Sequence, residues 1–329
     1  MSEKSPLDRL QILLADDLAA VNDLLANRMA SENAPRIPEV TAHLIGAGGK
    51  RLRPMLTLAS ARMFGYQGFD HHKLAATVEF IHTATLLHDD VVDQSARRRG
   101  RPTANLLWDN KSSVLVGDYL FSRSFQLMVE CGSLRILDIL ANAAATIAEG
   151  EVLQMTAAQD LATDQATYLR VVRGKTAALF AAACEVGAVV ANAPEPQVIA
   201  LRTYGDALGI AFQIADDVLD YTGEANAIGK NTGDDFREGK LTLPVILAIA
   251  QANATEHGFW KRTIEDGNQT DADLTQAIAT MTRHGTLQAT RQTALDWSTK
   301  ARAALADMPE SKLKSAFADL THYVVARLT

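Results

Sequence analysis

Two short acidic segments of nearly identical sequence are the part of this chain most suited to chemistry. The first, DDVVD, runs from Asp89 to Asp93, and the second, DDVLD, runs from Asp216 to Asp220. Both follow apolar stretches of helical character, and an α-helix brings residues four apart onto one face. Three carboxylates in one turn repel one another unless a cation lies between them. Mg²⁺ prefers such oxygen ligands and also binds phosphate oxygens, so the two segments predict a magnesium-dependent polyphosphate site.

A solvated acidic helix face is the alternative interpretation of one such segment. Its repetition at the end of two apolar segments argues against that alternative, because charges are costly to bury without partners. An EF-hand needs ligands at alternating loop positions, a central glycine and a closing glutamate. Neither segment has that spacing, which disfavours calcium storage.

Basic residues at the expected start of a helix form a candidate anion site. The segment GGKRLRP, residues 48–54, contains Lys50 and Arg53. Backbone N–H groups at a helix start attract anions, and the two side chains add positive charge. The segment lacks the preceding strand and the GKS/T ending of a Walker A loop. A solvated loop is the alternative interpretation.

Further basic and polar residues lie close to the acidic segments in the sequence. Arg97 begins RRRGRPT, four residues after the first segment. Arginine forks bind phosphate oxygens in pairs, and salt bridges to the nearby aspartates are the alternative. Lys175 and Thr176 lie in a helical segment, Gln213 precedes the second acidic segment by about one turn, and residues 229–240 form a polar loop with two lysines. Together these groups predict a site for two diphosphates, only one of which needs metal.

Composition excludes several other classes of protein. The net charge of −7 argues against general nucleic-acid binding, which uses a basic surface. Only Cys131 and Cys184 occur, as expected for a cytoplasmic protein without disulfides. The first residues have the pattern of neither a signal nor a transit peptide. Residues 177–193, the most apolar stretch, are too short for a transmembrane span and predict a helix buried on nearly all sides, either central or at a subunit interface.

Apolar residues recur at helical spacing almost everywhere, and no run of alternating strand pattern stands out. We therefore expect a single all-α domain over residues 1–329. The expected helices span residues 5–31, 37–46, 51–65, 71–93, 112–129, 134–159, 165–191, 196–221 and 241–252, with a looser helical tail over residues 257–327.

The order of these motifs resembles the all-trans polyprenyl diphosphate synthase family. The matching segments are GGKRLRP, IHTATLLHDDVVD, RRRGRPTAN, VGDYLFSRSFQLM, AEGEVLQM, GKTAALF, FQIADDVLDY and GKNTGDDFREGKLTLP, which together cover nearly the whole chain. The resemblance implies one large helical bundle of the isoprenoid synthase type around a central cavity, and a homodimer. It also implies Mg²⁺ as cofactor, with three ions when substrate is bound.

The resemblance assigns roles to individual residues. It implies that Asp89, Asp93 and Asp216 are the main Mg²⁺ ligands, with Asp90, Asp217 and Asp220 as auxiliary groups. The residues that match the allylic diphosphate site are Arg98, Lys175, Thr176, Gln213 and Lys230. Those that match the isopentenyl diphosphate site are Lys50, Arg53, His82 and Arg99. A lone histidine such as His82 on an apolar helix is otherwise read as a core residue.

The implied reaction is the successive head-to-tail condensation of isopentenyl diphosphate onto an allylic primer such as farnesyl diphosphate. Mg²⁺ helps the allylic C–O bond ionise, and the Thr176 hydroxyl and the Gln213 carbonyl are dipoles available to the cation. The proton is then lost to the departed diphosphate. A quinone side chain is the expected use of the product, whose release involves transient membrane contact.

Product length should depend on the residues that precede the first acidic segment. Ala84 and Thr85 lie about one helical turn before Asp89, and Ile81 lies about two turns before it. Small side chains here leave room for a long product, of roughly eight to ten isoprene units. Phe125, Met128 and Leu140 are candidates for a deeper floor, with core packing as the alternative. A geranylgeranyl diphosphate synthase and a non-catalytic subunit of a two-subunit synthase are the alternative functions.

Overall fold

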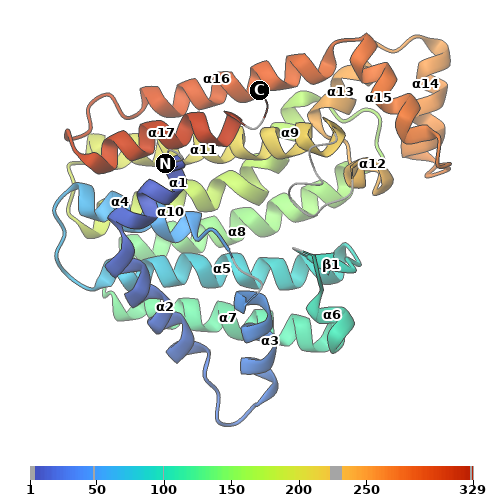
Figure 1. The fold of residues 1–329 in the computed structure, drawn as a ribbon. Coiled ribbons are helices and arrows are strands. Elements are labelled where there is room, and N and C mark those ends of the chain that lie inside the picture. Colours follow the sequence, from blue (N-terminus) through green and yellow to red (C-terminus); the bar gives the residue numbers. More distant parts are fainter. Residues whose placement is uncertain (1–3, 47–48, 99, 223–231, 327, 329) are drawn as a thin grey trace. The chain divides into compact units, whose positions relative to one another are not determined.

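The computed structural model describes residues 4–46, 49–98, 100–222, 232–326 and 328. In these ranges the chain is all-α except for one two-stranded hairpin (Figure 1). The predicted fold class is therefore confirmed, although the hairpin was not predicted. The chain divides into two compact units. Unit 1 comprises Met1–Ala144, Leu179–Gly205 and Ala304–Leu320, and unit 2 comprises Ala145–Ala178, Asp206–Ala303 and Thr321–Thr329. That residues 1–329 form one domain stays a prediction.

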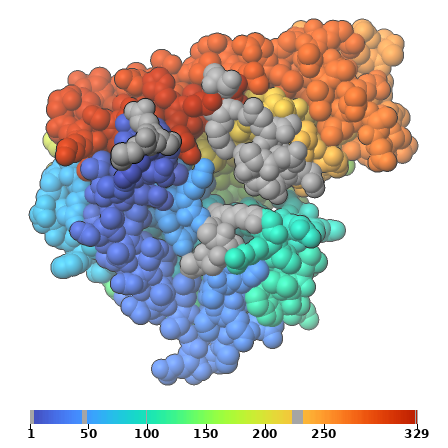
Figure 2. All heavy atoms as spheres, in the orientation of Figure 1, coloured from blue at the N-terminus to red at the C-terminus, as the bar shows by residue number. Residues whose placement is uncertain are grey.

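Unit 1 is built around α5 and α7, which lie side by side (Figure 1). Figure 2 shows α3, in blue, next to α6, in teal, on one face of this unit. The elements that lie wholly within unit 1 are α1 (Pro6–Leu13), α2 (Ala15–Met29), α3 (Arg36–Gly46), α4 (Leu52–Met63), α5 (Asp70–Val92), β1 (Arg97–Arg98), β2 (Arg101–Pro102), α6 (Ala104–Leu107) and α7 (Asn110–Glu130).

Unit 2 contains a cluster of helices in which α13, α15 and α16 pack on one another (Figure 1). Its own elements are α9 (Gln165–Val172), the π-helical turn η1 (Arg173–Ala177), α12 (Asp234–Arg237), α13 (Leu243–Ala250), α14 (Ala254–Trp260), the π-helical turn η3 (Lys261–Glu265), α15 (Asp273–Arg283) and α16 (Thr286–Ala303). Four helices contribute residues to both units: α8 (Leu134–Ala157), α10 (Ala178–Val190), α11 (Glu195–Thr222) and α17 (Lys312–Ala326).

Several helices begin where side chains satisfy the first backbone N–H groups. Ser5 and Asp8 form a capping box at the start of α1, with Pro6 as its first residue. Asp109 accepts the backbone N–H of Ser112 at the start of α7, and Asp164 caps α9 in the same way. These starts lie within about two residues of the predicted ones, which is the precision expected for helix boundaries.

Two predicted helices are interrupted. The helix expected over residues 5–31 breaks at Leu14 into α1 and α2, and the one expected over 165–191 contains the π-helical turn η1. The first break could not be seen in the sequence, because Leu10, Leu14, Val21 and Leu25 are buried and keep helical spacing across it.

The apolar stretch over residues 177–193 forms the core helix α10, which supplies Leu179, Phe180, Ala182, Ala183, Cys184, Val186, Gly187 and Ala188 to the interior. A Cβ on Gly187 would lie 2.4 Å from the Thr57 carbonyl oxygen, so glycine is needed for α4 to approach this closely. Of the two predicted placements, central or at a subunit interface, the structure shows the central one. Cys131 and Cys184 are both free thiols, as predicted. Within the described residues, no helix combines the length and the hydropathy that crossing a bilayer would require.

Candidate active site

The first acidic segment lies at the C-terminal end of α5 in unit 1. Asp89 and Asp93 are half-buried, whereas Asp90 between them is fully buried. Asp93 is the C-cap of α5, and Gln94 adopts a left-handed backbone with φ of 49° that ends the helix. The i to i+4 relation that predicted a shared face for Asp89 and Asp93 therefore holds in the structure.

The buried Asp90 is paired with the short hairpin that follows α5. Arg98 on β1 contacts Asp90 Oδ1 through both Nε and Nη2, each at 2.8 Å. Burial raises the pKa of Asp90 above its ordinary value, and the Arg98 guanidinium opposes that rise. The salt bridge weighed as the alternative role of the arginine run is thus formed by Arg98, and it fixes the hairpin to α5.

A basic group in unit 1 lies at the start of α4. Arg53 Nη1 is 3.2 Å from His82 Nε2, and its guanidinium lies 4.6 Å from the centre of the Phe180 ring. Arg51 adopts a left-handed backbone just before α4 and forms an ion pair with Glu79. A small cavity of about 20 Å³ has a lining that includes Arg51, Glu79, His82, Asp90 and Arg98. The structure thus brings together Arg53 and His82, while Lys50 is exposed at the neighbouring position.

The residues predicted to set product length lie in unit 1. Four of the six are buried: Ile81, Ala84, Met128 and Leu140. Thr85 is half-buried and donates a hydrogen bond to the His82 carbonyl over 2.8 Å. Phe125 is 45% exposed. Phe125 is therefore the most exposed of the six.

The second acidic segment lies near the C-terminal end of α11 in unit 2. Asp216 is half-buried, whereas Asp217 and Asp220 are buried. Asp220 accepts the backbone N–H groups of Asp234 and Asp235 over 3.2 and 3.1 Å, which joins the end of α11 to α12. Its carboxylate therefore has a structural function as a cap.

Lys175 and Thr176 lie in the π-helical turn η1, a feature often found at functional sites. The turn passes close to α8, since a Cβ on Gly174 would be 2.7 Å from the Gly150 Cα. Glycine at both positions thus permits this contact. It places Lys175 Nζ 3.1 Å from Glu151 Oε2 on α8.

Thr176, Gln213 and Asp217 are linked by hydrogen bonds. The Thr176 hydroxyl donates to Gln213 Oε1 over 2.8 Å, and Gln213 Nε2 donates to Asp217 Oδ1 over 2.8 Å. The Tyr168 hydroxyl donates to Asp217 Oδ2 over 2.6 Å. Burial, followed by the charge of Asp235, acts to raise the pKa of Asp217, and the hydrogen bonds from Tyr168 and Gln213 oppose that rise.

Tyr168, Gln213 and Asp217 line a cavity of about 110 Å³ within unit 2. Its charged and polar lining consists of Gln154, Thr163, Tyr168, Lys175, Gln213, Asp217, Asp235, Lys240 and Thr242. The rest is apolar, contributed by alanine, valine and leucine side chains. A cavity with an apolar wall and a few fixed polar groups suits a ligand with a charged head and a hydrocarbon body.

Two residues of the predicted sites, Arg99 and Lys230, lie outside the described residues. Among the residues at the sites that were not predicted are Glu79, Glu151, Tyr168 and Phe180. Glu151 gave a usable signal, because it is an acid within the segment AEGEVLQM that also carried the family resemblance. Tyr168 gave none, because one aromatic residue in an amphipathic helix is ordinarily a core residue.

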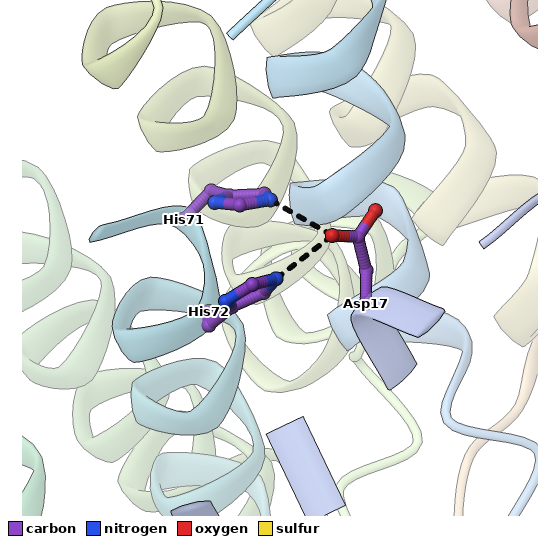
Figure 3. A group of neighbouring side chains, drawn as sticks. All are labelled: Asp17, His71 and His72. Atoms are coloured by element: carbon purple, nitrogen blue, oxygen red, sulfur yellow. Dashed lines mark hydrogen bonds and ion pairs between the residues drawn. The ribbon is translucent and has the colours of Figure 1, made fainter. Parts of the chain in front are cut away.

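A separate cluster in unit 1 joins α2 to the start of α5 (Figure 3). His71 Nε2 and His72 Nε2 lie 3.2 and 2.8 Å from Asp17 Oδ1. Arg62 also donates two hydrogen bonds to Asp17, from Nη2 to Oδ1 over 2.6 Å and from Nε to Oδ2 over 2.9 Å. A metal ion among the three ligand atoms would compete with the Arg62 guanidinium for the same oxygen. We therefore interpret the cluster as an ion-paired brace between helices.

This brace predicts a loss of stability in mild acid. Burial lowers the pKa of His71 from 6.5 to about 4, so between these values the unfolded chain takes up a proton that the folded chain does not. The free energy of unfolding should therefore fall by roughly 3 kcal/mol as the pH drops from 7 to 4. The Asp17 contribution is lost only at lower pH. Burial acts to raise the pKa of Asp17, but the Arg62 and His72 hydrogen bonds outweigh it and hold that pKa below its ordinary value.

Urea unfolding at a series of pH values measures this effect. In His71→Gln the fall between pH 7 and 4 should be largely absent, whereas the exposed His257→Gln should keep it. An unchanged pH profile in His71→Gln would contradict the assignment to His71.

Comparison with known proteins agrees with the motifs. The polyprenyl synthetase family model matches residues 34–281. The octaprenyl diphosphate synthase of Haemophilus influenzae is 42% identical over 321 residues, which cover 98% of this chain and 97% of that protein. The crystal structure of a decaprenyl diphosphate synthase from Rhodobacter capsulatus is 68% identical, with a TM-score of 0.96, over 98% of this chain and 99% of that chain.

A third relative was solved with ligands. The polyprenyl synthase of Caulobacter crescentus, complexed with calcium and isoprenyl diphosphate, is 51% identical with a TM-score of 0.94, and the match covers 100% of both chains. These similarities extend over essentially the full length, and the family model spans both acidic segments. The chain therefore belongs to the polyprenyl synthetase family.

Proposed function

We propose that this chain is a long-chain all-trans polyprenyl diphosphate synthase. It adds isopentenyl diphosphate repeatedly to an allylic diphosphate primer such as farnesyl diphosphate, with a product of roughly eight to ten isoprene units. The observation that carries the proposal is the presence of two acidic segments, each accompanied by basic residues, in a chain similar over its full length to octaprenyl and decaprenyl diphosphate synthases.

We assign divalent cation binding to Asp89, Asp93 and Asp216. These are the half-buried members of the two acidic segments, and their carboxylates are hard oxygen donors of the kind that suits Mg²⁺. The other members, Asp90, Asp217 and Asp220, are buried. Three Mg²⁺ ions would bind in the full complex. Their positive charge would favour departure of the allylic diphosphate.

The allylic substrate would bind through its diphosphate and react at its first carbon. Arg98, Lys175 and Lys230 supply positive charge, and the ion pair with Glu151 holds Lys175 at the cavity. As the C–O bond breaks, the diphosphate leaves with the electron pair and the allylic carbon becomes positive. The Thr176 and Gln213 oxygens are fixed dipoles that favour this charge. The apolar cavity wall keeps water away from it.

Isopentenyl diphosphate would bind to the basic group in unit 1. Lys50, Arg53 and Arg99 are the cations assigned to its diphosphate, and the contact with His82 orients Arg53. The double bond of isopentenyl diphosphate attacks the allylic cation and a C–C bond forms. The positive charge then lies on the isopentenyl unit, and the carbon next to it loses a proton. This proton passes to the departed diphosphate, so no side-chain base is needed.

We further propose a homodimer that acts in the cytoplasm and makes a precursor of a quinone side chain. Exposed apolar residues support the dimer, because Leu115 and Val129 on α7 are 66% and 67% exposed and lie on the same face as Phe125. Burying them against a second copy would remove apolar surface from water and cover Phe125. The free thiols Cys131 and Cys184 support the cytoplasmic location. A monomeric mass in light scattering at micromolar concentration would contradict the dimer.

Product analysis tests the proposed activity. Purified protein is incubated with Mg²⁺, farnesyl diphosphate and radiolabelled isopentenyl diphosphate, and the products are dephosphorylated and separated by reversed-phase chromatography. We expect labelled all-trans chains of roughly eight to ten units. A main product of four units would support the geranylgeranyl alternative instead. Incorporation that required a second protein would indicate a subunit of a two-subunit synthase.

A further inference from the structure

Four side chains of unit 2 form a continuous chain of hydrogen bonds at the second acidic segment. It runs from Thr176 through Gln213 to Asp217, which also accepts the Tyr168 hydroxyl. Both carboxylate oxygens of Asp217 therefore accept from protein donors. Asp216, one residue earlier on α11, is half-buried, whereas Asp217 is only 4% exposed. The two adjacent carboxylates thus occupy different environments.

The partners of Asp217 are held firmly. Tyr168 and Thr176 are 4% and 5% exposed, and side chains in close-packed interiors sit in rotamer minima with little free space around them. Gln213 is half-buried and lines the cavity of about 110 Å³ together with Tyr168 and Asp217. Gln213, the side chain whose orientation needs fixing, is therefore also among the residues that line the cavity.

These contacts determine which end of the Gln213 amide faces Thr176. The two ends of an amide are nearly identical in shape but opposite in polarity, so hydrogen-bond partners alone distinguish them. Asp217 Oδ1 accepts from Nε2, and this leaves Oε1 to face the Thr176 hydroxyl. Turning the amide over would place its oxygen against a carboxylate oxygen. The contact with Asp217 thus selects one orientation.

We propose that Asp217 is a positioning residue and not a metal ligand. With Tyr168 it holds the Gln213 amide so that its oxygen, beside the Thr176 hydroxyl, faces the allylic carbon where positive charge develops. This inference rests on the proposed function. It separates the roles of two neighbouring aspartates, with Asp216 assigned to the cation and Asp217 to the orientation of Gln213.

Two substitutions at Asp217 separate positioning from metal binding. In Asp217→Asn, the amide oxygen can still accept from Gln213 Nε2, and the new NH₂ group can donate to the Tyr168 oxygen. We therefore expect kcat within about threefold of wild type. Asp217→Leu has a similar size but no acceptor, and kcat should fall about a hundredfold while KM for both substrates stays within about twofold. If Asp217→Asn were as damaging as Asp217→Leu, the carboxylate charge would be essential and the proposal would be overturned.

Tyr168→Phe removes one donor from the network and keeps the ring. It should lower kcat about tenfold without changing either KM. Tyr204→Phe is the matched control, because Tyr204 is a fully buried tyrosine whose hydroxyl donates to the Phe317 carbonyl over 3.0 Å in unit 1. It should lower the unfolding temperature and leave kcat unchanged. An equal loss of kcat in both variants would show that Tyr168 acts through stability alone.

Binding provides a readout that does not depend on turnover. Titration calorimetry with Mg²⁺ and an allylic thiolodiphosphate, which does not ionise readily, measures the metal-dependent affinity. Asp217→Asn and Asp217→Leu should bind the analogue within about twofold of wild type, whereas Asp216→Asn should bind it at least about tenfold more weakly. Weakened binding in Asp217→Leu equal to that in Asp216→Asn would make Asp217 a metal ligand. A wild-type protein that forms no prenyl chains would instead refute the proposed function, and the role assigned to Gln213 with it.

Discussion

Replacing Asp216 with Asn should lower kcat about a thousandfold, because a loss of about 4 kcal/mol of transition-state stabilisation corresponds to that factor. Asn retains the shape of the side chain but removes the negative charge assigned to the divalent cation. Asp216 is half-buried and Asn has nearly the same size, so the substitution creates no cavity in the core and the fold should survive. Asp89→Asn should have an effect of similar size, because Asp89 is assigned the same role in the first acidic segment.

Steady-state kinetics at increasing Mg²⁺ concentration measures this prediction. The half-saturating Mg²⁺ concentration should rise in both variants. Asp296→Asn is the matched control, because it removes an equal charge from an exposed position on α16 and should leave kcat unchanged. Helical circular dichroism excludes unfolding as the cause. Wild-type turnover that persisted in excess EDTA would contradict a role for divalent cations altogether.

The acidic segments could be found in the sequence because carboxylates at the end of apolar helical stretches are unusual. Which of these aspartates are buried and which are half-buried could not be found in the sequence. Asp216 and Asp217 are adjacent letters, and helical geometry says only that they point about 100° apart. Which of the two is buried depends on the packing of Tyr168 from α9, which no local pattern encodes. The same holds for Asp90, whose burial depends on Arg98 in a two-residue strand that the sequence did not predict.

The π-helical turn η1 also could not be predicted from the sequence. Residues 165–191 have helical periodicity throughout, yet the chain forms a π-helical turn at Lys175 and Thr176. The turn depends on the contact between Gly174 and Gly150, which lie on different elements. Secondary-structure propensity treats glycine in a helix only as a cost. Here the two glycines allow the close approach that brings Lys175 to Glu151. Residues of low helix propensity thus lie at the proposed site.

Burial also changes which substitution best tests product length. Ala84 is fully buried in unit 1, so a phenylalanine there would overpack the core at a cost of about 1–3 kcal/mol. Thr85 is half-buried and has more room for a ring. Both lie about one helical turn before Asp89, where a growing chain would pass. Thr85→Phe is therefore the variant of choice, and Ala84→Phe is the more demanding test.

Thr85→Phe should shorten the main product to about four isoprene units, because a chain forced past the rigid ring would bear an overpacking penalty at each further addition. The first condensation should proceed at nearly the wild-type rate, since the residues assigned to the cations and diphosphates are unchanged. Thr85→Ser, which keeps the hydroxyl that donates to the His82 carbonyl, is the control and should give the wild-type product. Chromatography of the dephosphorylated products measures the lengths. If Thr85→Phe and Ala84→Phe both folded and both made wild-type chains, the product would have to grow along a path that avoids the end of α5.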